Sequence, residues 1–161
     1  IKGGYSMIVN DYSAELVVAS RFAEAGWNVY FPHRDKGFDF IVSKEVEGQG
    51  EMIRPVQVKG KYPMDEKGDK AVYGYVGKLT KLHPEMILAI PYYSGTTTLI
   101  PEFVSYMPIS TIKECSRGYK CQPASFRKGK PVPREYFKKF IDNEGLKLAE
   151  REDWRAITID Y

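Results

Sequence analysis

The chain has 161 residues, of which 43% are hydrophobic and 28% are charged. This composition predicts one globular domain with its own core, and it excludes a disordered or repetitive protein. No apolar run is long enough to span a bilayer, and the first residues lack the apolar block of a signal peptide. We therefore expect a soluble, cytoplasmic protein.

The formal net charge of +3 is distributed unevenly along the chain. Residues 113–139 hold nine basic and two acidic side chains, a local charge of +7, which leaves −4 for the remainder. A basic segment on an otherwise mildly acidic protein favours an anionic partner, and a solvated lysine-rich surface is the alternative interpretation.

The first predicted element is a helix over residues 12–25, which Asp11 or Ser13 would cap and Gly26 would end. Helical spacing places Glu15 on the side of this helix that is otherwise apolar. A carboxylate on an inward face is a candidate functional group, whereas a first-turn glutamate stabilised by the helix dipole is the structural alternative.

Extended segments separated by turn residues follow this helix. In the last of them, strand alternation puts Val56 and Val58 on one face and Gln57 and Lys59 on the other. The predicted elements are strands at 28–31, 38–42 and 52–59, with turns at 32–37 and 48–50.

The second half is expected to start with a polar loop over 60–72 and then a buried strand over 86–93. Another strand is predicted over 96–104, interrupted at Pro101, and residues 107–112 start either a helix or a short strand. The Gly- and Pro-rich basic stretch reads as a loop, and helices are predicted from Pro133 to about residue 142 and over 144–154. This order indicates an α/β protein with a central mixed sheet flanked by helices.

Four side chains from these elements fit the chemistry of phosphodiester hydrolysis. Asp39 provides a hard anionic ligand for Mg²⁺, and the Gln57 amide and the Val58 main-chain carbonyl provide neutral oxygens. Lys59 projects from the same strand face as Gln57 and can orient a water or stabilise charge on the phosphate. Glu15 can reach the same ion from the first helix.

The order of Glu15 in an early helix, then Gly37-Phe-Asp39, then Val56-Gln57-Val-Lys59 resembles the PD-(D/E)XK nuclease superfamily. It looks most like archaeal Holliday-junction resolvases and small restriction and homing endonucleases, over roughly residues 8–93. The resemblance implies a restriction-endonuclease-like, three-layer core over about 8–112. It also implies a Mg²⁺-dependent endodeoxyribonuclease, with Mn²⁺ as a substitute ion. Asp39, Gln57, Val58 and Glu15 would hold the metal, and Lys59 would assist the attacking water.

The sequence departs from that family at Gln57, where an aspartate or glutamate is usual. The missing charge should weaken metal binding and make Glu15 more important for it. A catalytically inactive DNA-binding protein that keeps the fold is therefore the main alternative. An unrelated interaction protein with a coincidental motif is a third hypothesis, which predicts that Asp39 and Lys59 lie on opposite sheet faces.

The expected partner is duplex or branched DNA, and cutting both strands requires at least a homodimer. When bound to DNA the protein would be associated with the nucleoid. Cys115 and Cys121 can pair, can bind a metal with His33 or His83, or can remain free thiols, which a reducing compartment favours. The candidate DNA-contacting cations are Lys78, Lys81, Arg117, Lys120, Arg127, Lys128, Lys130 and Arg134.

Overall fold

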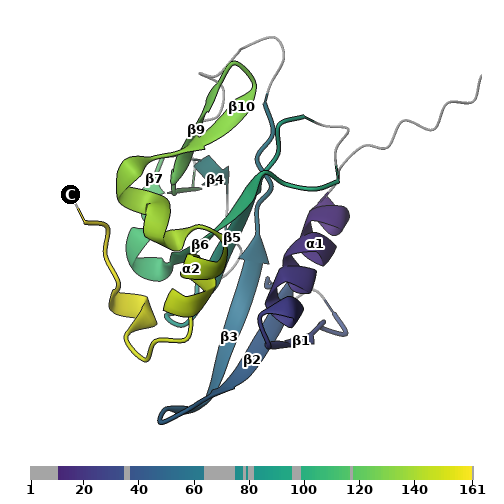
Figure 1. The fold of residues 1–161 in the computed structure, drawn as a ribbon, viewed down its shortest axis with the longest axis vertical. Helices are drawn as coiled ribbons and strands as arrows, with labels where there is room; N and C mark the ends of the chain where they lie inside the picture. The colour runs from purple at the N-terminus through teal and green to yellow at the C-terminus, as the bar shows by residue number, and fades with distance from the viewer. Residues whose placement is uncertain are drawn as a thin grey trace, which may run out of the picture.

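The computed structural model contains a five-stranded mixed sheet with the order β1-β2-β3-β5-β6 (Figure 1). Strands β1 to β3 form an antiparallel meander, β3 and β5 pair in parallel, and β6 returns antiparallel to β5. This confirms the predicted α/β class and the central mixed sheet. The strands are β1 Asn28–Tyr30, β2 Phe40–Val46, β3 Gly50–Val58, β5 Ile87–Tyr92 and β6 Phe103–Pro108. The structure describes residues 11–34, 37–63, 75–77, 79, 82–95, 99–116 and 118–160.

Helix α1, Asp11–Glu24, confirms the first predicted element. It ends before Gly26, whose φ of +88° is a left-handed conformation that glycine adopts at little cost. The Phe22 ring of α1 lies 6.0 Å from that of Phe40 and 5.4 Å from that of Tyr106, both edge to face. These buried aromatic contacts fix α1 against the sheet.

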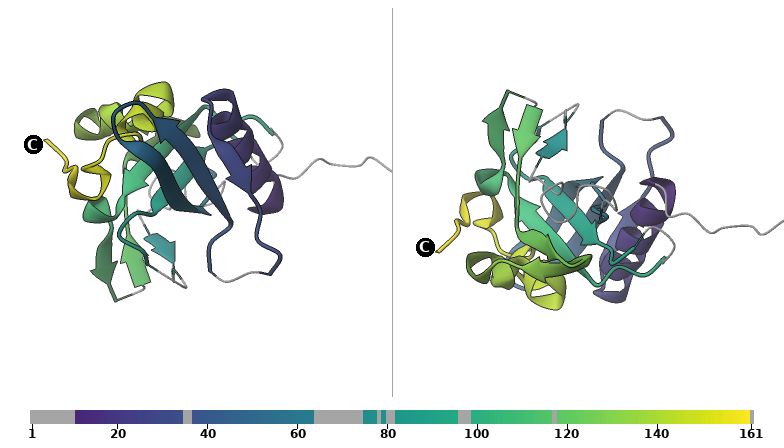
Figure 2. Two further views of the ribbon diagram at one scale, coloured as in Figure 1. Left: turned by 90° about the horizontal axis from the view of Figure 1, so that it is seen from below. Right: turned by 90° about the horizontal axis from the view of Figure 1, so that it is seen from above.

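Helix α2, Asp142–Leu148, packs on the same face of the sheet as α1 (Figure 2). Phe40 pairs with Val56 and Val42 with Arg54, so these side chains point to one side. The Arg54 guanidinium donates to the carbonyl of Ala149, just after α2, at 2.8 Å.

No helix in the described part of the chain is long and apolar enough to cross a membrane.

The opposite face of the sheet is covered by short strands, where the sequence predicted flanking helices and a basic loop (Figure 2). The basic stretch was predicted to be a loop because its Gly and Pro residues hide a strand pattern. In β9 that pattern is the alternation of buried Ala124 and Phe126 with more exposed neighbours. The strands are β4 Tyr75–Gly77, β7 Lys113–Cys115, β8 Gly118–Lys120, β9 Ala124–Arg127 and β10 Lys130–Pro133.

Three further boundaries differ from the predictions. The strand predicted over 96–104 starts only at Phe103 and runs to Pro108, where a 3-10 turn, Ile109–Thr111, follows. Pro133 ends β10 instead of opening a helix, and the following Glu135–Phe140 segment is a 3-10 helix, η3. The last α-helix therefore begins at Asp142, two residues earlier than expected. Residues 64–72 of the predicted 60–72 loop lie outside the described residues.

Candidate functional site

Asp39 lies immediately before β2 and is held against β3 by two hydrogen bonds. Its main-chain N–H donates to the Val56 carbonyl at 2.9 Å. One carboxylate oxygen, Oδ2, accepts the Val58 N–H at 2.6 Å. A carboxylate can accept further bonds or ligate a cation through its remaining lone pairs. The half-buried Asp39 side chain is thus fixed beside the segment that carries Gln57 and Lys59.

Gln57 and Lys59 occupy the end of β3, on the sheet face that carries Asp39. Phe40 pairs with Val56, so Asp39 and Gln57, each one residue away, both belong to the opposite face. Gln57 is only 4% exposed, whereas Lys59 is half-buried just after the strand and its N–H donates to the Ala89 carbonyl at 3.0 Å. The register therefore does not give the opposite-face arrangement of Asp39 and Lys59 that would have supported the interaction-protein hypothesis.

Glu15, the fifth residue of α1, lines the same surface pocket as Asp39. This pocket has a volume of about 310 Å³, and its other walls are Tyr12, Phe31, Pro32 and Phe38. Two carboxylates from segments 24 residues apart therefore share one cavity. Gln57 and Lys59 do not line this pocket and are connected to it through the hydrogen bond between Asp39 and Val58.

The donor chemistry of these groups fits a hard divalent cation. Glu15 and Asp39 offer carboxylate oxygens, and the Gln57 amide oxygen and the Val58 carbonyl are further oxygen donors close to Asp39 in the fold. The described residues contain no group of three or more His, Cys, Asp and Glu side chains placed to hold a metal. A metal site here would therefore depend on amide and main-chain oxygens in addition to the two carboxylates.

Lys61 extends the row of polar side chains along the end of β3, and the sequence analysis missed it. Its N–H donates to the Pro91 carbonyl and its own carbonyl accepts the Tyr93 N–H, both at 2.9 Å, so the parallel pairing with the β5 segment continues past Val58. Burial lowers the pKa of Lys61, and the nearby Lys59 cation lowers it further. The Lys59-Gly-Lys61 alternation was the available signal for this second lysine.

Both cysteines are free thiols, one of the outcomes that the sequence left open. Cys121 is 3% exposed, and its sulfur lies 3.8 Å from the Thr111 hydroxyl oxygen. Burial raises the pKa of the Cys121 thiol to about 12, although the Thr111 hydroxyl and Lys61 oppose this shift. A thiol that stays protonated is a poor nucleophile and a poor metal ligand, which leaves Cys121 as a packing residue beside Lys61.

The structure places the candidate DNA-contacting cations on several elements. Arg127, Lys128 and Lys130 surround the turn of the β9–β10 hairpin and are exposed, and Lys120 is exposed at the end of β8. Arg134 donates to the Gln122 carbonyl at 3.0 Å and its guanidinium lies 5.1 Å from the centre of the Phe137 ring. The remaining three candidates, Lys78, Lys81 and Arg117, lie outside the described residues.

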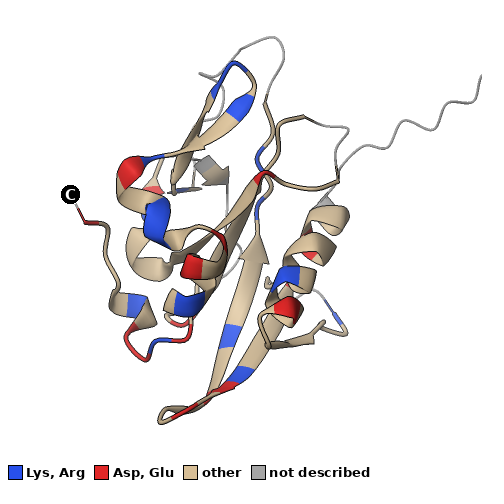
Figure 3. Cartoon of the chain, in the orientation of Figure 1, with Lys and Arg blue, Asp and Glu red and all other residues tan. Residues whose placement is uncertain are grey.

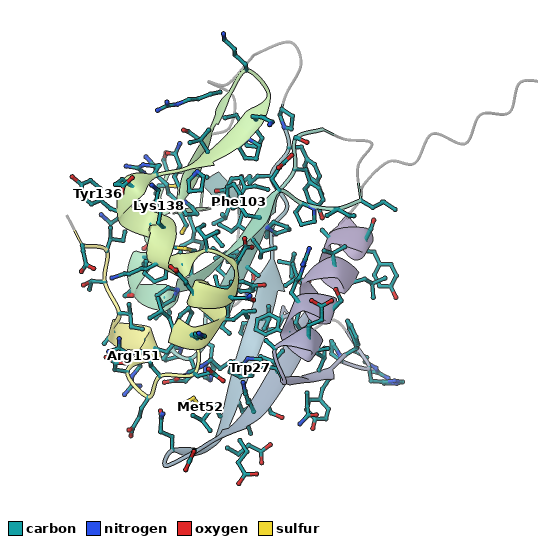
Figure 4. All side chains as sticks on the ribbon, viewed as in Figure 1. Trp27, Met52, Phe103, Tyr136, Lys138 and Arg151 are labelled. Atoms are coloured by element: carbon teal, nitrogen blue, oxygen red, sulfur yellow. The ribbon has the colours of Figure 1, made fainter. Side chains whose placement is uncertain are left out.

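The aromatic side chains within the basic segment mostly pack inward. Phe126 and Phe137 are 2% and 4% exposed, so they belong to the core and not to a binding surface. Figure 4 shows Phe103 in the interior, and Tyr136 and Lys138 at the outer edge of η3. Tyr136, half-exposed, is the aromatic group of this segment that is best placed to meet a partner.

Comparisons with known proteins identify no relative of this chain. No family model, curated protein or solved structure matches it.

Proposed function

We propose that the protein is a Mg²⁺-dependent endodeoxyribonuclease of the PD-(D/E)XK type. The observation that carries the proposal is the 2.6 Å hydrogen bond from the Val58 N–H to the Asp39 carboxylate. This bond connects Asp39 to the segment that carries Gln57 and Lys59, two motifs that are separate in the sequence. The central mixed sheet with α1 packed on one face also supports this assignment.

Each residue of the site has a role in this proposal. Glu15, Asp39 and Gln57, with the Val58 carbonyl, would hold Mg²⁺ near the scissile phosphate. The ion supplies Lewis acidity toward a phosphoryl oxygen when it is bound. Lys59 orients the attacking water and offsets the negative charge that develops on the phosphate. The Val58 N–H keeps the Asp39 carboxylate from rotating away from this position.

Gln57 supports the second candidate function, a DNA-binding protein without catalytic activity. Because Gln57 is neutral and 96% buried, the site holds one negative charge fewer than a site with a carboxylate there. Weaker metal binding would follow from that missing charge. In this alternative the fold and the basic hairpin would bind DNA, and the site would not cleave it.

A nicking assay separates the two functions. The protein is incubated with supercoiled plasmid and with a branched duplex, in Mg²⁺ or in EDTA. We expect nicks only with Mg²⁺, and a loss of rate of about 100-fold or more in Asp39→Ala and Lys59→Ala, since each removes a group that acts on the transition state. Asp160→Ala, which removes an exposed side-chain carboxylate near the C-terminus, is the control. Nicking that survives both site substitutions would rule out this site, and DNA binding without cleavage would favour the second function.

A further inference from the structure

The β9–β10 hairpin turns through an unfavourable residue. Arg127 pairs with Lys130, so the loop between the strands consists of Lys128 and Gly129 alone. Both have positive φ, 51° for Lys128 and 77° for Gly129. Two-residue turns of this kind favour asparagine followed by glycine. A lysine in the left-handed region is strained because its Cβ crowds the following carbonyl, so the backbone conformation of this turn does not favour Lys128.

The hairpin is firmly attached to the rest of the molecule. Phe126, the third residue of β9, is 2% exposed, and its ring lies 6.0 Å from that of Tyr92 in β5. At the other end of the hairpin, the Arg134 N–H donates to the Pro123 carbonyl at 2.9 Å. The cations at the turn are therefore carried by strands that are anchored to the core, so a ligand would not have to order the backbone of the hairpin.

The charge at this turn is opposite to that at the far end of the molecule (Figure 3). The β9–β10 turn carries the exposed cations Arg127, Lys128 and Lys130. The β2–β3 turn carries the exposed carboxylates Glu45, Glu47 and Glu51. Glu45 and Glu51 lie opposite each other in the register of the two strands. An anionic polymer would be attracted to the first end and repelled from the second.

The base of the hairpin lies next to the candidate active site. Lys61 pairs with Tyr92 of β5 in a parallel bridge, and the Tyr92 ring lies 6.0 Å from that of Phe126 in β9. Lys61 follows Lys59 by two residues on the same strand face. β9 also covers the sheet face to which Asp39 and Gln57 belong, through the contact of Phe126 with Tyr92.

We propose that the β9–β10 turn is a sequence-independent anchor for the phosphate backbone of duplex DNA, and that Lys128 is retained for its charge at the expense of turn stability. The identity of the polymer as DNA rests on the proposed function. The three cations neutralise phosphates beside the cleavage site and read no bases. A two-stranded ribbon of this kind has dimensions that the major groove admits, which places all three cations within reach of the phosphates along it.

The test is Lys128→Asn, which installs the residue that this turn prefers. Binding to two duplexes of unrelated sequence is measured by fluorescence anisotropy in EDTA over a range of salt, and stability is measured by urea unfolding. We expect the variant to be as stable as the wild type or more stable, and to bind both duplexes about three- to tenfold more weakly at low salt. The slope of log K against log salt should fall in magnitude by about 0.9.

Two further variants complete the experiment. Lys128→Arg should retain the wild-type affinity because it keeps the charge. Lys147→Gln, at an exposed position of helix α2, should leave DNA binding unchanged. The inference is overturned if Lys128→Asn binds DNA with the affinity and the salt dependence of the wild type. It is also overturned if the wild type binds only one of the two duplexes, binds only RNA, or fails to bind duplex DNA.

Failure of the nuclease proposal gives a different result. A protein that binds DNA through Lys128 but shows no nicking in Mg²⁺ would support the anchor and refute the catalytic activity. A protein that nicks DNA but binds it equally well after Lys128→Asn would support the activity and refute the anchor.

Discussion

Replacing Arg54 with alanine is expected to lower the free energy of unfolding by about 3–5 kcal/mol, a large part of the stability of a typical domain. Arg54 is 2% exposed in the middle of β3. Its guanidinium donates to the carbonyls of Ala149 and Arg151, each at 2.8 Å, and forms an ion pair with Glu85. It also lies 5.9 Å from the centre of the buried Trp154 ring.

The cost arises from the groups that would remain after the substitution. The buried Ala149 carbonyl would lose its charged donor, and an unsatisfied buried group costs about 1–3 kcal/mol. The Arg151 carbonyl would lose the same donor but would keep the Trp154 N–H, at 3.1 Å. Burial lowers the pKa of Arg54 and Glu85 opposes this change, so the ion pair offsets part of the cost of desolvating the guanidinium. The alanine would also leave a cavity under Trp154, whose ring N–H donates to the Met86 carbonyl at 3.0 Å.

Equilibrium urea unfolding followed by tryptophan fluorescence measures this effect. Arg151→Ala is the matched control, because its side chain forms an exposed ion pair with Asp153 while its carbonyl is retained. We expect the control to change stability by less than about 1 kcal/mol. Equal destabilisation by the two substitutions would contradict the role assigned to Arg54.

Replacing Gln57 with glutamate is expected to make the stability of the protein depend on Mg²⁺. Gln57 is 4% exposed, and a carboxylate at that position would be desolvated. We expect the free energy of unfolding in EDTA at pH 8 to fall by about 2–3 kcal/mol, since a buried carboxyl resists ionisation. Mg²⁺ at about 100 times its dissociation constant should return about 2.7 kcal/mol, because it binds only the folded state.

Thermal unfolding with and without Mg²⁺ measures this response. Gln49→Glu, at the exposed β2–β3 turn, is the control and should not respond to the ion. Destabilisation of Gln57→Glu that Mg²⁺ fails to reverse would show that Gln57 is a packing residue and not a metal ligand. We also expect Mg²⁺ to stabilise the wild-type protein less than it stabilises Gln57→Glu, because the wild-type site has one negative charge fewer.

The first half of the fold follows from local sequence signals. Helical spacing with Gly26 as a stop predicted α1, and alternation predicted that Gln57 and Lys59 share a strand face, away from Val56 and Val58. Asp39 was expected beside them only by resemblance. Its hydrogen bond to Val58 depends on the register in which Phe40 faces Val56, and sequence alone does not specify that register.

The remaining features depend on tertiary packing. The pocket shared by Glu15 and Asp39 exists because Phe22 packs on Phe40 and Tyr106, which positions the N-terminal part of α1. In the basic segment, Gly and Pro concealed the strands β9 and β10, of which β9 buries alternate residues and β10 is only partly buried. The burial of Arg54 could not be predicted from the sequence, because its partners, Ala149 and Arg151, lie about 100 positions away.

Titration calorimetry with Mn²⁺ tests most directly whether Glu15 and Asp39 share one cation. The comparison is between the wild type and Asp39→Asn, which keeps an oxygen to accept the Val58 N–H but removes the charge. We predict one binding site in the wild type and a loss of affinity of about tenfold or more in Asp39→Asn, with a similar loss in Glu15→Gln. Equal Mn²⁺ binding by the wild type and both variants, or no binding by the wild type, would contradict the proposed metal site.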